Sequence, residues 1–305
     1  MITTQKETPM TKNIHILYLL IMISTLIHAG KIAPTTQDIR AFPLAEDTLT
    51  LQASYDRVNG GIDILSLNKT PSTPYSALGS SLGLDFSLGY GAKEYLTLYY
   101  KIKAQNIRYG QNAHYKQDTL KNRQQELYAR INFYDSPQYS FDDLSLDVGY
   151  IHNSADDFAT LKDLTDNSYY LRLLWGSKLK SSLFNFYTGV KYTSKKKSNE
   201  KAFSLGATHT VEFSHYILDT RYEYIRIIAR KEGLGKNKSN HLLDMNLARS
   251  INDSWLIFIG TSLMTNQFNG LIPSLYNAQT EASFDKTYHY LKLGFVYNFS
   301  AKNLK

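Results

Sequence analysis

The chain has 305 residues, a net charge of +7, 24 tyrosines and no cysteine. The lack of cysteine excludes disulfides and thiol chemistry. No stretch beyond residue 30 approaches the ~20 continuous apolar residues of a membrane-spanning helix. The basic residues are spread along the chain rather than gathered on one face, so we expect no nucleic-acid partner.

Residues 1–30 have the order of a secretory signal peptide. Lys12 precedes an apolar run over residues 14–27, and small residues follow at the end of the segment. We expect cleavage there, with translation starting at Met1 or Met10. An N-terminal membrane anchor is the alternative, which the shortness of the apolar run disfavours.

Twelve segments between residues 48 and 299 alternate apolar and polar side chains, which is the period of a β-strand. Residues 31–47 precede them as a predicted periplasmic lead-in, and residues 300–305 follow as a short tail. Most segments reach the length of about 9–11 residues that a tilted strand needs to cross a bilayer. The predicted strands are 48–58, 78–90, 95–108, 125–134, 141–153, 167–176, 183–193, 202–213, 216–229, 239–249, 254–264 and 286–299.

The connections between these segments alternate in length. Short turns such as 91–94 and 214–215 alternate with long loops such as 59–77 and 265–285. Short periplasmic turns and long external loops are typical of outer-membrane barrels, and an even number of strands places both chain ends in the periplasm. The sequence therefore predicts an all-β protein, a twelve-stranded antiparallel transmembrane β-barrel of the bacterial outer membrane. We expect outer-membrane lipids and the barrel assembly machinery as its partners.

The two faces of each strand differ in chemistry. On the second predicted strand Leu84 and Phe86 face lipid while Asp85 faces inward; only the eleventh, 254–264, is apolar on both faces and leaves its register open. Acids and bases occur inside in equal number, which predicts a lumen braced by ion pairs rather than a wide channel of one charge sign. A narrow polar pore is the alternative. These inward residues are Asp85, Glu126, Asp147, Glu212, Asp219, Glu223 and Asp244 with Lys101, Lys103, Arg130, Arg172, Lys191, Arg221 and Lys292.

Three polar residues lie on the lipid-facing side of two neighbouring strands. His152 and Ser154 continue the row of Val148 and Tyr150 on the fifth strand, and Asn167 begins the sixth. A serine hydroxyl becomes a nucleophile when an imidazole accepts its proton, and a carboxamide can orient the imidazole in place of a carboxylate. Because the group lies beside lipid, the spacing suggests a hydrolase of lipid esters. The alternative is a set of interfacial residues near the membrane rim, where polar groups are tolerated.

Two segments resemble a known family. Gly149–Ser154 reads Gly-Tyr-Ile-His-Asn-Ser, and Asn167–Leu173 reads Asn-Ser-Tyr-Tyr-Leu-Arg-Leu. These are similar to the active-site stretch of the outer-membrane phospholipase A family, in which Gly-Tyr-x-His-x-Ser is followed by Asn-x-x-Tyr-x-Arg-Leu. The resemblance implies a phospholipase A1/A2-type carboxylic ester hydrolase on a twelve-stranded barrel, with His152 as the base, Ser154 as the nucleophile and Asn167 as the orienting residue.

The resemblance also implies a calcium-dependent enzyme that acts as a homodimer. The chain differs from the family after the serine, where Ala155-Asp156 replaces Asn-Gly. Carboxylates in and beside the following loop offer the hard oxygen ligands that calcium prefers, although an acidic external loop is also simply soluble. The candidate ligands are Asp156, Asp157, Asp163 and Asp166.

Two other function classes stay open at this point. A passive channel or porin for small solutes would use the inward residues and leave His152 without a role. A structural or adhesive barrel would act through its loops and would include a phospholipase relative that has lost activity. The contacts of His152 with Ser154 and Asn167, and whether the lumen is blocked, discriminate between these classes.

Overall fold

The computed structural model describes residues 39–59, 78–109, 119–135, 143–156, 166–179, 182–195, 199–230, 238–265 and 287–300. The predicted signal peptide, residues 31–38 of the predicted lead-in and residues 301–305 of the tail lie outside the described residues. Within the described ranges, no helix is long and apolar enough to cross a membrane.

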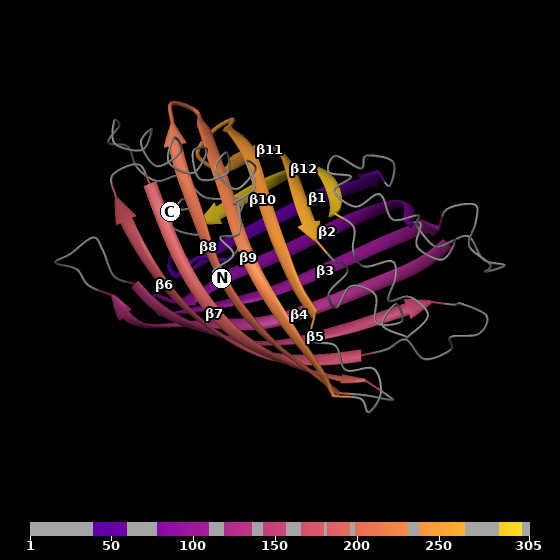
Figure 1. Ribbon diagram of the computed structural model, residues 1–305. Helices are drawn as coiled ribbons and strands as arrows, with labels where there is room; N and C mark the ends of the chain where they lie inside the picture. Colours follow the sequence, from indigo (N-terminus) through magenta and orange to yellow (C-terminus); the bar gives the residue numbers. More distant parts are fainter. Residues whose placement is uncertain are drawn as a thin grey trace, which may run out of the picture.

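The strands of the described chain form one closed antiparallel barrel, in which each strand pairs with its neighbours in sequence (Figure 1). The last strand pairs with the first, so the sheet has no open edge. The prediction of a twelve-stranded antiparallel barrel is confirmed. Its strands are β1 (Thr48–Asn59), β2 (Leu78–Lys93), β3 (Leu96–Tyr109), β4 (Thr119–Asp135), β5 (Asp143–Asp156), β6 (Asp166–Leu179), β7 (Ser182–Lys195), β8 (Asn199–Phe213), β9 (Tyr216–Arg230), β10 (Lys238–Ser250), β11 (Trp255–Thr265) and β12 (Thr287–Ser300).

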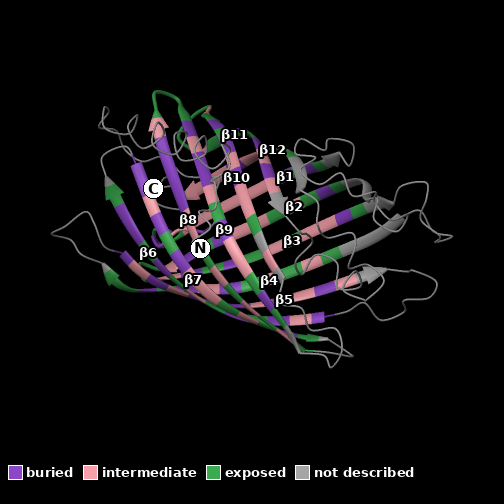
Figure 2. Cartoon of the chain, viewed as in Figure 1, coloured by how far each residue is buried: buried purple, intermediate pink, exposed green. Residues whose placement is uncertain are grey.

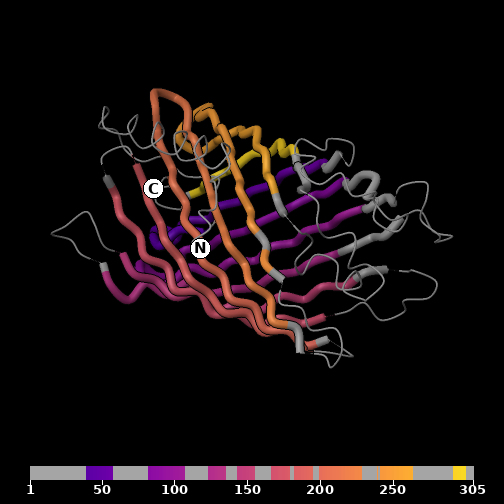
Figure 3. Tube along the Cα trace, viewed as in Figure 1, coloured from indigo at the N-terminus to yellow at the C-terminus, as the bar shows by residue number. Residues whose placement is uncertain are grey.

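The chain winds around the barrel in sequence order, from indigo β1 to yellow β12 (Figure 3). Most strand ends lie within a few residues of the predicted ones. β4 differs most, because it begins at Thr119 rather than at residue 125. Its first residues pair with both neighbours, for example Leu120 with Ile107 on β3 and Lys121 with Asp156 on β5. The polar residues there do not alternate with apolar ones, so the sequence pattern did not reveal this end of the strand.

Burial alternates along the strands as the period of two requires (Figure 2). The lipid-facing positions hold exposed apolar side chains such as Leu84 and Leu293. β11, whose register the sequence left open, presents Ile259 outward and buries Phe258. Gly294 on β12 makes room for that ring, since a Cβ there would lie 2.6 Å from Phe258 Cζ.

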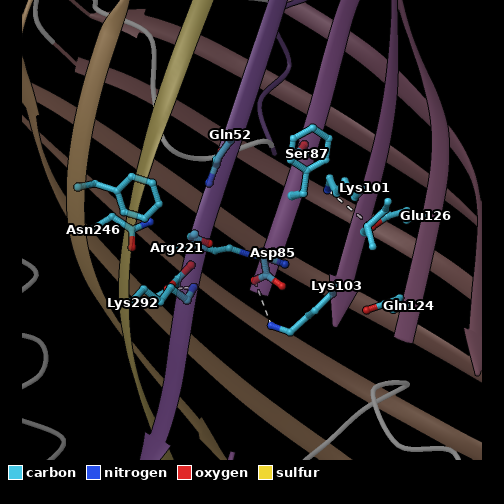
Figure 4. Close-up of a pocket in the computed structure, with 15 residues that line it drawn as sticks. Gln52, Asp85, Ser87, Lys101, Lys103, Gln124, Glu126, Arg221, Asn246 and Lys292 are labelled. Carbon is cyan, nitrogen blue, oxygen red and sulfur yellow. Dashed lines mark hydrogen bonds and ion pairs between the residues drawn. The ribbon is translucent and has the colours of Figure 1, made fainter. Parts of the chain in front are cut away.

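Ion pairs brace the inside of the barrel, as the sequence predicted. Arg130 donates hydrogen bonds of 2.7 Å and 3.0 Å to the carboxylate of Asp147, and both side chains are completely buried. Lys103 Nζ lies 3.2 Å from Asp85 and 3.3 Å from Asp56, an inward acid that was not among the predicted ones. Such pairs line a cavity of about 210 Å³ inside the barrel (Figure 4).

Residues 39–47, the described part of the predicted lead-in, lie across one end of the lumen; we call them the N-terminal plug. The Leu44 amide donates to Thr97 Oγ1 on β3 (2.9 Å), and the Ala41 amide donates to Asn185 Oδ1 on β7 (2.8 Å). On β8, Thr208 Oγ1 donates to the carbonyl of Ile39 (3.3 Å). The N-terminal plug therefore bridges opposite walls of the barrel near the short β2–β3 turn.

Candidate active site on the lipid-facing side of β5 and β6

The register of β5 and β6 sets the position of each candidate side chain. His152 is directly opposite Asn167, and Tyr150 is opposite Tyr169. Tyr169 is 56% exposed on the outside of the barrel, so the same-face residues of both strands point toward lipid. The structure therefore places the site on the outer surface and away from the lumen.

One carboxamide oxygen is the centre of the hydrogen bonds at this site. His152 Nδ1 lies 2.8 Å from Asn167 Oδ1, and the Tyr150 hydroxyl donates to the same oxygen over 2.7 Å. Because a carboxamide oxygen only accepts, Nδ1 carries the imidazole proton in this arrangement. In the neutral ring with this tautomer, Nε2 is unprotonated and can accept a proton from a nucleophile.

Ser154 lies two residues beyond His152 on the same face of β5. Positions two apart on a strand are separated by about 6–7 Å, a distance that a side chain leaning along the strand can cover. The hydrogen bonds within the described part of the site join Tyr150 and His152 to Asn167 and do not include Ser154. The structure thus brings His152 and Asn167 together, and register alone places Ser154 beside them.

Other residues of the two segments that resemble the phospholipase family lie on the inner face of the same strand pair and contact one another there. The Tyr170 ring packs over Gly149, where a Cβ would lie 2.2 Å from Tyr170 Cζ. The Tyr170 hydroxyl donates to Glu126 Oε1 (2.6 Å), and the guanidinium of Arg172 lies 5.1 Å from the Tyr170 ring. Gly149, Tyr170 and Arg172 therefore fix β5 against β6 from inside, directly behind the site.

Of the four candidate calcium ligands, Asp166 is the one whose side chain the structure describes. Asp166 is buried on the inner face, opposite to that of Asn167, and accepts a hydrogen bond from Asn153 Nδ2 (2.6 Å). Among the residues that the structure describes, no group of three or more His, Cys, Asp or Glu could hold a metal ion. Asp157, Asp163 and the side chain of Asp156 lie outside the described residues, so calcium binding by them stays a prediction.

Tyr150 is a residue of the site that the sequence pattern did not predict, because its side chain fits the apolar row that faces lipid. The position of Tyr150 in the sequence could nevertheless have predicted its contact with Asn167. A tyrosine two residues before His152 lies on the same face and diagonal to Asn167 across the strand pair, within reach of a long side chain.

No family model and no curated protein matches the sequence. Among solved structures, an outer membrane channel from Pseudomonas putida F1 has a TM-score of 0.59 at 9% identity, over 88% of this chain and 100% of that one. The translocator domain of the autotransporter NalP from Neisseria meningitidis has a TM-score of 0.48 at 10% identity, over 95% and 96%. LpxR from Salmonella typhimurium has a TM-score of 0.45 at 10% identity, over 82% and 99%.

At these identities the likeness concerns the fold alone. The closed barrel, its apolar outer surface and its charged interior define the class of the protein. It is a β-barrel of the bacterial outer membrane.

Proposed function

We propose that the protein hydrolyses acyl ester bonds of phospholipids at the outer leaflet, with Ser154 as the nucleophile, His152 as the general base and Asn167 as the orienting residue. The observation that carries this proposal is the 2.8 Å contact between His152 Nδ1 and Asn167 Oδ1 on the lipid-facing side of β5 and β6. Polar side chains are costly on a lipid-facing surface, so a hydrogen-bonded imidazole there supports a functional role.

The chemistry follows from the proton on Nδ1. His152 Nε2 accepts the proton of Ser154 Oγ as that oxygen attacks the acyl carbonyl carbon, which forms a tetrahedral intermediate. Its collapse breaks the ester bond, and the imidazolium gives its proton to the departing glycerol oxygen. Water then attacks the acyl-enzyme while Nε2 accepts its proton; collapse releases the fatty acid and returns the proton to Ser154. Asn167 stabilises the imidazolium and keeps its ring oriented throughout.

The barrel interior supports this proposal over a channel for small solutes. The N-terminal plug crosses one end of the lumen, and Arg130 and Asp147 are completely buried inside it. A solute channel needs a continuous hydrated path, and these features place protein across part of that path. A lipid hydrolase with its site on the outer surface has no need of the lumen.

The test is release of fatty acid from phospholipid by purified protein in mixed micelles. Ser154→Ala should remove nearly all activity, because no acyl-enzyme can form, and His152→Ala should reduce the rate by about 10²-fold or more. Asn167→Ala should be milder, because it removes only the orienting bond. Ser87→Ala changes a lumen-facing serine and serves as the matched control.

The same assay tests the two properties that the family resemblance predicts. If calcium is required, a chelator should abolish activity and added calcium should restore it. If the enzyme is a homodimer, activity should rise with its surface concentration in the micelles. Wild-type protein without fatty-acid release at any calcium concentration would contradict the proposed function.

A further inference from the structure

Tyr150 shares its hydrogen-bond acceptor with the proposed base. Its hydroxyl donates to Asn167 Oδ1 over 2.7 Å, and His152 Nδ1 lies 2.8 Å from that same oxygen. A carboxamide oxygen has two lone pairs and can accept both bonds. Two donors from β5 therefore converge on one acceptor from β6.

The hydrogen bond from Tyr150 restricts the χ2 torsion of Asn167. The terminal χ2 torsion of asparagine is broad and roughly two-fold, so one hydrogen bond defines the carboxamide plane poorly. If the carboxamide turned over, its NH₂ group would face the imidazole. Nδ1 would then have to accept, the ring proton would move to Nε2, and His152 could no longer take a proton from Ser154.

The ring of Tyr150, which carries this hydroxyl, packs against a neighbouring tyrosine. The rings of Tyr150 and Tyr169, which are paired across the strands, have centroids 5.3 Å apart at an angle of 46°. Such tilted aromatic contacts are favourable. Replacing Tyr150 by phenylalanine therefore keeps this packing and removes only the donor.

We propose that Tyr150 is a positioning residue that acts through Asn167 to keep the proton of His152 on Nδ1. Its consequence for catalysis rests on the proposed function. The effect of Tyr150 on the imidazole is independent of the proposed function, because the position of the ring proton can be measured even if the protein has no hydrolase activity.

The first measurement is the ¹⁵N spectrum of protein labelled in the histidine rings, which separates protonated from unprotonated ring nitrogens. His152→Gln identifies the signals of His152 by their loss. In wild-type protein the proton should be on Nδ1, and in Tyr150→Phe a population with the proton on Nε2 should appear. Tyr169→Phe, which removes a neighbouring hydroxyl that does not contact Asn167 in the described structure, should leave the spectrum unchanged. Heat-modifiable migration checks that each variant has folded.

The second measurement is a kinetic cycle. Tyr150→Phe should lower kcat by about 2- to 10-fold, the size of one hydrogen bond, with KM unchanged. In an Asn167→Ala background it should have no further effect, because the residue through which it acts is gone.

Two results would overturn the proposal. One is an unchanged proton position in Tyr150→Phe, and the other is an equal loss of kcat with and without Asn167. If wild-type protein is inactive, the proposed function fails, and the ¹⁵N spectrum alone decides whether Tyr150 positions His152.

Discussion

Replacing Asp147 by asparagine should strongly destabilise the barrel. Asp147 accepts bonds of 2.7 Å and 3.0 Å from Arg130, and Arg172 approaches it to 3.5 Å from the adjoining strand. The side chains of Asp147 and Arg130 are both 0% exposed. The substitution keeps the shape of the side chain, but it leaves a buried guanidinium without its counter-charge.

The expected loss follows from this burial. Two unit charges about 4 Å apart attract by about 4 kcal/mol at an effective dielectric constant of about 20. Removing one partner of a buried pair destabilises proteins by about 3–5 kcal/mol, because the remaining charge is neither paired nor hydrated. Replacing both residues together, as in Arg130→Met with Asp147→Leu, should cost much less. Lys93→Gln is the control, since it breaks the exposed pair with Glu46 and should cost at most about 1 kcal/mol.

The assay is reversible unfolding in guanidinium chloride from lipid vesicles, followed by the fluorescence of the chain's two tryptophans. A loss below about 1 kcal/mol for Asp147→Asn, as exposed pairs give, would show that water reaches the carboxylate. That result would refute the burial of this ion pair and would favour a hydrated channel.

Two further predictions concern the barrel as a whole. Purified protein in planar bilayers should show little steady conductance, because the N-terminal plug crosses one end of the lumen and ion pairs brace its walls; large, stable, ion-selective steps would argue for a channel. Deleting Tyr297–Phe299 should abolish membrane assembly, because these residues pair with Leu49 and Leu51 on β1 and close the sheet. Normal heat-modifiable migration of the truncated protein would contradict this second expectation.

The strands could be predicted because lipid requires one face of each strand to be apolar, and that requirement is visible in the alternation of residues. The alternation of apolar and polar residues did not predict the structure at positions where contact with lipid does not determine the residue type. The first residues of β4 extend past the apolar alternation, and β11 has apolar residues on both faces. Its register depends on the space that Gly294 leaves for Phe258 on a different strand, which the sequence of β11 does not contain.

The site was predictable in part for the same reason. The period of two places His152 and Ser154 on one face of β5, but the contact with Asn167 depends on the register between β5 and β6, which the alternation within each strand does not determine. The same period puts Asp166 on the face opposite to Asn167, where its side chain is buried, although it was a predicted calcium ligand. The role of Tyr150 needed the position of a hydroxyl at the end of a long side chain.

The alternation of apolar and polar residues did not predict the N-terminal plug, because the residues that hold it lie on strands far apart in the sequence. Ala41, for example, donates to a side chain 144 residues away in the sequence. Its apolar side chains are buried against inward-facing residues of the wall, such as Leu174 and Tyr187. Only the closed ring brings these partners together.

The seam between β1 and β12 bears on the order in which the protein assembles. At this seam Thr50 Oγ1 donates to Asn298 Oδ1 over 2.8 Å, across 248 residues of sequence, so the contact that completes the ring joins the two ends of the barrel sequence. Contacts of such long range form slowly, because the chain loses much entropy before they are made. We therefore expect closure of the ring between β1 and β12 to be the slow step of assembly, because it must bring the two ends of the barrel sequence together.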